Sequence, residues 1–126
     1  MTIEDIQRIF AEEFSAVQEK FKVLVLPANE VTNSSEEFLW HPGVYVWWHP
    51  ERGPLKVGRH FTNSRKRALG HVRDNTGGVL KEYGNRSDTK LLLFNVRNRN
   101  DYHWVAALEV FLESKLNPYV RSKRQG

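Results

Sequence analysis

The segment GVYVWWHPERGPLKVGR, residues 43–59, decides the fold that the sequence predicts. Its first six residues are apolar and rich in β-branched and aromatic side chains, which is typical of a strand. Prolines and a glycine in residues 49–54 predict a turn, and residues 55–59 predict the returning strand of a β-hairpin. Because neighbouring side chains of a strand face opposite sides, we expect one of Trp47 and Trp48 in the core and the other partly exposed.

The sequence before the hairpin predicts a helix and a strand. Thr2 and Asp5 have the spacing of a helix capping pair. Apolar residues then recur at steps of three and four, which predicts an amphipathic helix continuing to Phe21. These apolar positions are Ile3, Ile6, Phe10, Phe14, Val17 and Phe21. Residues 21–26 are apolar and β-branched and predict a short strand that ends at Pro27.

The sequence after the hairpin predicts a helix, a strand and a second helix. Thr62, Asn63 and Ser64 are candidate caps for a helix over residues 62–74. Residues 90–96 predict a buried strand. Asp101 is the expected cap of a final helix that runs to about Leu116 and is stopped by Pro118.

The order of these elements predicts an α/β protein of the α+β type. We expect a small antiparallel or mixed central sheet flanked by helices. The chain has 126 residues, the usual size of one domain. We expect one compact domain, in which residues 1–37 add a helix and a strand to a main unit of residues 38–126. The apolar side chains Phe10, Phe14 and Phe21 require burial, so this addition is expected to pack on the sheet.

Composition excludes several classes of site. The chain has no cysteine, so a disulfide framework, a thiolate nucleophile and a Cys-ligated zinc are impossible. Glu4 and Asp5 stand where a signal peptide requires a basic region, and no stretch approaches the roughly 20 apolar residues of a membrane span. We therefore expect a cytoplasmic protein without a membrane partner.

Basic side chains are concentrated in one part of the chain. The formal net charge is +4, but residues 1–37 carry eight acidic and only three basic side chains. No acidic residue lies between Arg52 and Arg73. The basic residues of this part are Arg52, Lys56, Arg59, Arg65, Lys66, Arg67 and Arg73. Such a cluster predicts a surface that binds the phosphates of nucleic acid, and a solvated basic face is the alternative.

Four short motifs follow one another in a fixed order. They are Gly43-Val44-Tyr45 in the first hairpin strand, Lys56-Val57-Gly58 in the second, Arg67 and His71 on the predicted helix, and Glu109 on the last helix, with Pro118 nine residues later. In order and spacing these motifs resemble those of the GIY-YIG nuclease superfamily, over roughly residues 42–120.

The resemblance implies hydrolysis of DNA phosphodiester bonds with one divalent metal ion, Mg²⁺ or Mn²⁺. Tyr45 matches the family's tyrosine, which activates or orients the attacking water. Arg67 matches the arginine that contacts the scissile phosphate, and His71 matches the histidine one turn later. Glu109 matches the glutamate that binds the metal ion.

Two positions differ from the family's pattern. Lys56 stands where the second motif usually has tyrosine, and Arg121 stands where the family often has asparagine. We include Lys56 among the candidate catalytic residues, because a cation near Tyr45 lowers the pKa of its phenol from the ordinary value of about 10.

The residue types suit the chemistry that the resemblance implies. A guanidinium such as that of Arg67 pairs with two phosphate oxygens and keeps its charge. A carboxylate such as that of Glu109 suits Mg²⁺, which retains most of its water ligands. On the last helix, Glu109 is expected at the edge of the apolar stripe, where it can enter a cleft. This stripe consists of Val105, Leu108, Leu112 and Leu116.

Three functions remain open from the sequence. The leading hypothesis is a DNA endonuclease, with RNA as a less favoured substrate and with a homodimer or a protein partner as a source of specificity. The second is a catalytically inactive module of the same fold that binds nucleic acid, because Lys56 and Arg121 depart from the family's pattern. The third is a protein-interaction domain that uses the acidic N-terminal helix.

Overall fold

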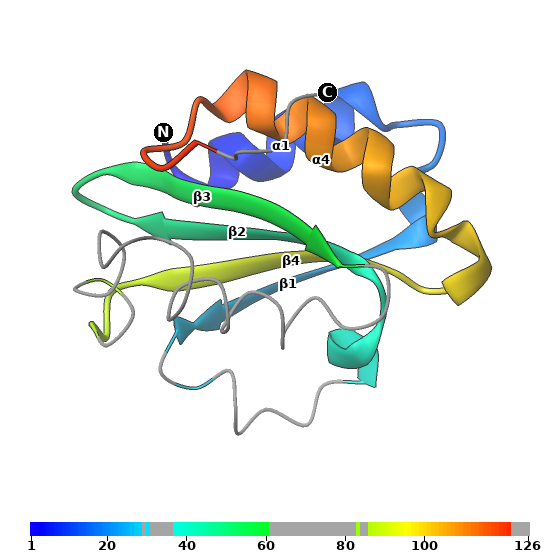
Figure 1. The fold of residues 1–126 in the computed structure, drawn as a ribbon, viewed down its shortest axis with the longest axis horizontal. Coiled ribbons are helices and arrows are strands. Elements are labelled where there is room, and N and C mark those ends of the chain that lie inside the picture. The colour runs from blue at the N-terminus through cyan, green and yellow to red at the C-terminus, as the bar shows by residue number, and fades with distance from the viewer. Residues whose placement is uncertain (29, 31–36, 61–82, 84–85, 122–126) are drawn as a thin grey trace.

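A four-stranded antiparallel sheet with the strand order β1-β4-β2-β3 forms the centre of the protein (Figure 1). The computed structural model describes residues 1–28, 30, 37–60, 83 and 86–121. The strands are β1 (Phe21–Pro27), β2 (Gly43–His49), β3 (Gly53–His60) and β4 (Lys90–Val96). The helices α1 (Ile3–Glu13) and α4 (His103–Leu116) lie on the same side of the sheet in Figure 1. The described residues also form the short 3₁₀ helices η1 (Gln18–Lys20), η3 (Glu37–Trp40) and η4 (Arg99–Asp101). The predicted α+β class is confirmed.

The predicted hairpin is formed by β2 and β3. Gly53 has a positive φ of 72°, which a glycine adopts at little cost, where the chain enters β3. The register of the hairpin shifts between Trp47 and Trp48. Trp47 is buried, whereas Trp48 is partly buried on the other face of the sheet and donates its indole N–H to the Met1 carbonyl at 2.9 Å. The expected division between one core and one partly exposed tryptophan is confirmed.

Alternate residues of the strands supply two hydrophobic clusters, one on each face of the sheet. The cluster on the face covered by α1 and α4 includes Val44, Val46, Val57, Leu92, Phe94 and Val96. The cluster on the opposite face includes Tyr45, Trp47, Leu55, Leu91 and Leu93. Burial on both faces explains why the interior strand β4 is a nearly continuous apolar run.

The first helix begins where the sequence predicts and ends earlier. The Thr2 hydroxyl accepts a hydrogen bond from the Asp5 N–H at 3.1 Å, and the reciprocal bond completes the capping box. The prediction that the helix continues to Phe21 is wrong, because α1 ends at Glu13. Its last residues include two acidic side chains and no basic one, an arrangement that the helix macrodipole disfavours. Phe14 and Phe21 are nevertheless buried, as expected, and pack with Phe10.

The last helix has the predicted apolar face and the predicted end. Val105, Leu108, Leu112 and Leu116 are all buried. After α4 the chain adopts the left-handed conformation at Asn117, with φ 47° and ψ 62°. Among the described residues, neither α4 nor any other helix is long and apolar enough to cross a lipid bilayer.

The predicted role of Asp101 as the cap of the last helix is wrong. Asp101 belongs to η4, which is capped by Asn98 through a 2.9 Å hydrogen bond from the Asn100 N–H. α4 begins later, at His103, without a side-chain cap. The Asp101 carboxylate instead lies 3.8 Å from the Lys20 ammonium, so an ion pair with an earlier part of the chain takes the place of the cap.

Candidate active site

The tyrosine of the first motif lies opposite the glycine of the second motif on the neighbouring strand. Tyr45 and Gly58 are cross-strand partners in the ladder between β2 and β3, and Tyr45 is fully buried. A Cβ atom at Gly58 would overlap the hydroxyl end of the Tyr45 ring. The phenol therefore extends from β2 over β3, which is an edge strand of the described sheet. Glycine at position 58 leaves the space that the tyrosine occupies.

Steric crowding also explains why the first motif has a glycine at position 43. A Cβ atom at Gly43 would overlap the side-chain oxygen of Asn95 on β4 and would approach the Phe94 carbonyl oxygen within 2.6 Å. Asn95 is buried and donates a hydrogen bond from its amide to the Phe38 carbonyl at 2.8 Å. Gly43 thus permits the close contact of β2 with β4 that fixes the start of β2, two residues before Tyr45.

Lys56 lies on the same face of the hairpin as Tyr45. The register pairs Lys56 with Trp47, and both Trp47 and Tyr45 face the cluster opposite the helices. A residue diagonally across a β-ladder is within reach of a long side chain. Lys56 is only 8% exposed, which is unusual for a lysine. Its position is therefore compatible with the predicted cation beside the Tyr45 phenol.

The predicted metal ligand, Glu109, forms an ion pair with β3. The guanidinium of Arg59 donates to one carboxylate oxygen, Oε1, at 2.6 Å, and the two side chains are 19% and 10% exposed. A charge-assisted hydrogen bond of this length with little surrounding water is a strong contact. Within α4, the neighbours of Glu109 at four residues distance are Val105 and Glu113, so the cation comes from a strand instead. The Glu109 carboxylate therefore already has a cationic partner within the protein.

The structure brings Tyr45 and Glu109 to consecutive residues of β3, but on opposite faces of the sheet. Tyr45 contacts Gly58, and Glu109 contacts Arg59, the next residue. Because side chains alternate along a strand, Gly58 and Arg59 face opposite sides. A single phosphodiester can therefore reach both groups only around the edge of β3 that faces away from β2.

Glu109 retains an oxygen that suits a metal ion. Its second carboxylate oxygen, Oε2, makes no hydrogen bond or ion pair with any residue that the structure describes. Mg²⁺ commonly takes one or two carboxylates and keeps several water ligands. The described residues contain no group of three His, Cys, Asp or Glu side chains that could hold a metal ion. Among the described residues, the Glu109 carboxylate therefore fits one hard ion that keeps most of its water ligands.

Five of the predicted site residues lie outside the described residues. They are Arg65, Lys66, Arg67, His71 and Arg73, on the predicted helix over residues 62–74. β3 ends at His60, which is two residues after Gly58 and pairs with Gly43. β3 is thus the last described element before this basic segment in the sequence.

Arg52, also predicted to bind nucleic acid, lies at the opposite end of β3 and has protein partners. Its Nε donates to the Tyr83 hydroxyl at 3.2 Å, and its guanidinium lies 4.4 Å from the centre of the Tyr119 ring. The Tyr119 N–H donates to the Pro54 carbonyl at 3.1 Å, so the segment after α4 runs beside the start of β3. These contacts give Arg52 a structural role at the hairpin turn.

Arg121, at a position where the resembling family often has asparagine, is bound to α4. It donates to the Asn117 side-chain oxygen at 2.8 Å, and its Nε lies 3.5 Å from a Glu113 carboxylate oxygen. The asparagine nearest to the family's position thus serves as a partner of Arg121 at the end of the helix.

Sequence reasoning missed a buried histidine at the hairpin turn. His49 is fully buried, and its Nδ1 accepts a hydrogen bond from the Glu51 N–H at 3.1 Å. Its other ring nitrogen, Nε2, lies 2.9 Å from an Asp88 carboxylate oxygen. Desolvation acts to raise the pKa of Asp88, but the hydrogen bond with His49 and the charge of Arg86 outweigh it, so this pKa is lowered. No spacing in the sequence relates His49 to Asp88, because they come from separate segments.

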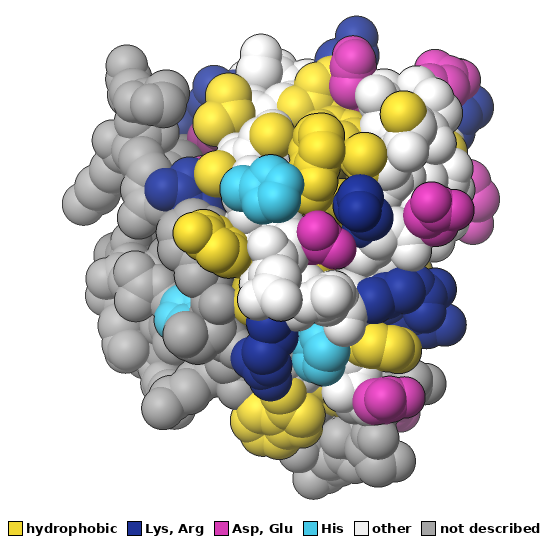
Figure 2. All heavy atoms as spheres, turned by 90° about the vertical axis from the view of Figure 1, so that its right-hand side faces the viewer, with side chains coloured by type: hydrophobic (Ala, Val, Ile, Leu, Met, Phe, Trp, Pro, Cys, Tyr) yellow, Lys and Arg dark blue, Asp and Glu magenta, His cyan; other side chains and the backbone are white. Residues whose placement is uncertain are grey.

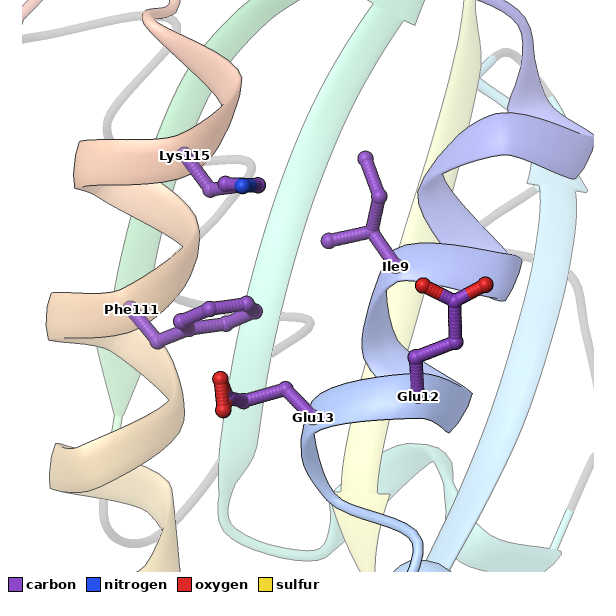
Figure 3. Close-up of a pocket in the computed structure, with 5 residues that line it drawn as sticks. All are labelled: Ile9, Glu12, Glu13, Phe111 and Lys115. Carbon is purple, nitrogen blue, oxygen red and sulfur yellow. The ribbon is translucent and has the colours of Figure 1, made fainter.

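A groove between α1 and α4 is separate from these residues. Figure 3 shows that Ile9, Glu12 and Glu13 line it from α1 and that Phe111 and Lys115 line it from α4. Two carboxylates and one ammonium give its walls a net negative charge, which disfavours a phosphate group. The groove is therefore not a candidate for binding nucleic acid.

Comparisons with known proteins add no relative. No protein-family model, no curated protein and no solved structure matches this chain. The resemblance to GIY-YIG nucleases therefore rests on the sequence motifs alone.

Proposed function

We propose that the chain is a metal-dependent endonuclease that hydrolyses phosphodiester bonds in DNA. The observation that carries the proposal is the contact of Tyr45 with Gly58, because it joins the first two motifs through a steric dependence of one on the other. The proposed metal ligand Glu109 contacts Arg59, the residue that follows Gly58 on β3. The basic segment supports binding of a polyanion. A cytoplasmic location is part of the proposal, supported by the absence of cysteine.

The proposed reaction assigns one task to each side chain. An oxygen of water forms a bond to phosphorus, while the bond from phosphorus to the leaving sugar oxygen breaks and that oxygen takes a proton from solvent to leave as a hydroxyl. The Tyr45 hydroxyl orients this water or takes its proton, and Lys56 favours the ionised phenol by its charge. Arg67, followed one turn later by His71, pairs with the phosphate oxygens on which negative charge grows. Bound at Oε2 of Glu109, Mg²⁺ or Mn²⁺ would supply charge neutralisation at the phosphate.

A second candidate function is a module that binds nucleic acid without cleaving it. The ion pair between Arg59 and Glu109 favours this alternative, because a guanidinium at 2.6 Å reduces the attraction of the carboxylate for a metal ion. Arg121 also favours this alternative, because it stands at the position where the family often has asparagine and its side chain is bound to Asn117 and Glu113. This function predicts salt-dependent binding of DNA with no metal-dependent cleavage.

The change Tyr45→Phe tests the proposed activity, because it removes one hydroxyl and keeps the ring. We expect nicking of supercoiled plasmid in the presence of Mg²⁺ or Mn²⁺ to fall by about 100-fold or more. Tyr83→Phe is the matched control, since Tyr83 is also a buried tyrosine whose hydroxyl has a hydrogen-bond partner. Wild-type protein that binds DNA but never cleaves it would support the second candidate function, and full activity of Tyr45→Phe would remove Tyr45 from the mechanism.

A further inference from the structure

Aromatic and basic side chains, most of them exposed, meet at the end of the sheet where β2 begins and where β3 and β4 end. We call this the η3–η4 surface. It consists of Trp40, His41, Arg97, Arg99, Tyr102 and His103. Figure 2 shows this end of the molecule, where hydrophobic side chains lie beside Lys, Arg and His side chains.

Two flat rings of this surface are open to solvent. Trp40 is 48% exposed and Tyr102 is 55% exposed, in a chain that buries Trp47 almost completely. Large aromatic side chains contribute most to stability when they are buried, so an indole left half in water suggests a binding partner. Tyrosine and tryptophan rings in such positions can stack on nucleic-acid bases, and stacking tolerates any base because every base has a flat π-face.

The η3–η4 surface is held in shape by hydrogen bonds between separate segments. Arg99 donates to the Trp40 carbonyl at 3.4 Å, which connects η4 to η3. The His41 ring donates from Nδ1 to the Val96 carbonyl at 2.9 Å, which connects the start of β2 to the end of β4. The rings and the cations are therefore presented from a frame fixed by the sheet, which lowers the entropic cost of binding a partner.

The charge of the surface selects an anionic partner. Arg97 and Arg99 are both exposed. Arg97 lies 5.4 Å from the centre of the Phe38 ring and makes no ion pair with any carboxylate that the structure describes. The nearby Asp101 carboxylate of η4 is paired with the Lys20 ammonium at 3.8 Å. The acidic side chain of η3 is Glu37, which is exposed. Guanidinium groups beside flat rings suit the alternation of phosphate and base along a nucleic-acid strand.

The surface lies at the same end of the hairpin as the candidate active site. Gly43 pairs with both His60 and Asn95, so the start of β2 lies between the ends of β3 and β4. Tyr45 follows Gly43 by two residues, and the segment after His60 carries the predicted phosphate-binding arginines. A strand bound on this surface would therefore extend toward the contact between Tyr45 and Gly58.

We infer that the η3–η4 surface binds unpaired nucleotides of single-stranded DNA, with Trp40 and Tyr102 stacking on bases and Arg97 and Arg99 contacting phosphates. Bases inside a duplex are stacked on one another and cannot also stack on Trp40, so the surface distinguishes single-stranded from double-stranded segments. This inference rests on the proposed function for its biological setting, and it names DNA with an unpaired segment as the substrate class.

The test measures binding in EDTA, where metal-dependent cleavage is absent. Fluorescence anisotropy of a labelled 12-nucleotide single strand and of the matching duplex is compared for wild-type protein and for Trp40→Ala. We expect Trp40→Ala to weaken binding of the single strand by about 10-fold and to leave duplex binding unchanged. Trp40→Phe should retain most of the affinity, because it keeps a flat ring.

Tyr119→Ala is the matched control, because Tyr119 is also an exposed aromatic next to an arginine, at the opposite end of β3. It should bind both DNAs like the wild type. Tyr102→Ala repeats the test at a second position, so that one misfolded variant, recognised by its thermal unfolding curve, does not decide the outcome. The inference is overturned if Trp40→Ala binds the single strand like the wild type, if it loses the two DNAs equally, or if wild-type protein binds no single strand.

Separate assays distinguish this inference from the proposed nuclease activity. Binding of the single strand that depends on Trp40, without any cleavage, would support the η3–η4 surface and contradict the nuclease. Cleavage of plasmid without any effect of Trp40→Ala on binding would support the nuclease and overturn the surface. Self-association that is lost in Trp40→Ala, with DNA binding intact, would assign the surface to a second copy of the chain and overturn the inference.

Discussion

The ion pair between Arg59 and Glu109 should be one of the strongest single contacts between the sheet and α4. The perturbation is a double-mutant cycle of Arg59→Ala, Glu109→Ala and the combined variant. Two unit charges about 4 Å apart attract by about 4 kcal/mol at an effective dielectric constant of about 20. The pair is 19% and 10% exposed, so water screens it little, but desolvation cancels part of the attraction. We expect a coupling energy of about 1.5–3 kcal/mol.

Urea unfolding of the four proteins, followed by circular dichroism, measures this coupling. The chain provides a matched control in Arg8 and Asp5, whose charged groups lie 3.1 Å apart but are 61% and 41% exposed. This exposed pair should give a coupling of about 0.2–0.5 kcal/mol. A coupling for Arg59 and Glu109 no larger than that of the control would refute the reasoning, since burial would then have no effect on the strength of the pair.

Two further predictions concern the neighbourhood of the site. Gly58→Ala should lower the free energy of unfolding by about 1–3 kcal/mol in urea unfolding, because its methyl group would overlap the Tyr45 ring; an unchanged stability would contradict the proposed packing. The lowered pKa of Asp88 means that its carboxyl binds fewer protons in the folded than in the unfolded state near pH 4. Its contribution to stability is therefore present above that pH and is lost as the pH falls through the folded pKa. Asp88→Asn should flatten the rise of unfolding temperature between pH 3 and 5, and the same slope in wild type and variant would contradict this assignment.

The sequence predicted the sheet well because local signals define its strands. The prolines and the glycine of the turn, together with β-branched and aromatic runs, located β2 and β3, and the run LLLF located β4. The periodic stripe of α4 was equally informative, since it reports burial on one face. Strand order and the pairing of β1 with β4 depend on contacts between distant segments, which periodicity does not contain.

The errors show what periodicity measures. Phe14 and Phe21 continue the helical spacing and are buried, but they follow the end of α1, where the chain makes tighter turns before β1. The spacing thus predicted burial in a common cluster correctly and the helix wrongly. For Asp101, a local rule for capping was outweighed by a contact with Lys20 from an earlier element.

The candidate site was predictable only in part, because its contacts join residues that are distant in the sequence. Tyr45, Lys56 and Glu109 were selected from the order of the motifs. The structure adds an explanation for the glycine at position 58, because a larger residue would overlap the Tyr45 ring. The partner of Glu109 could not be predicted, because Arg59 lies 50 residues away and belongs to another element. The pair of His49 and Asp88 also joins separate segments and has no local signature.

The most direct test of the proposed nuclease is cleavage of supercoiled plasmid by wild-type protein and by Glu109→Gln, with Mg²⁺, with Mn²⁺ and with EDTA. Glu113→Gln is the control, since Glu113 lies one turn further along α4 and pairs with Arg121. We predict nicking by wild type and Glu113→Gln only when metal is present, and a loss of about 100-fold or more in Glu109→Gln with DNA binding intact. Cleavage that persists in EDTA, or full activity of Glu109→Gln, would contradict the assignment of Glu109 as the ligand of a catalytic metal ion.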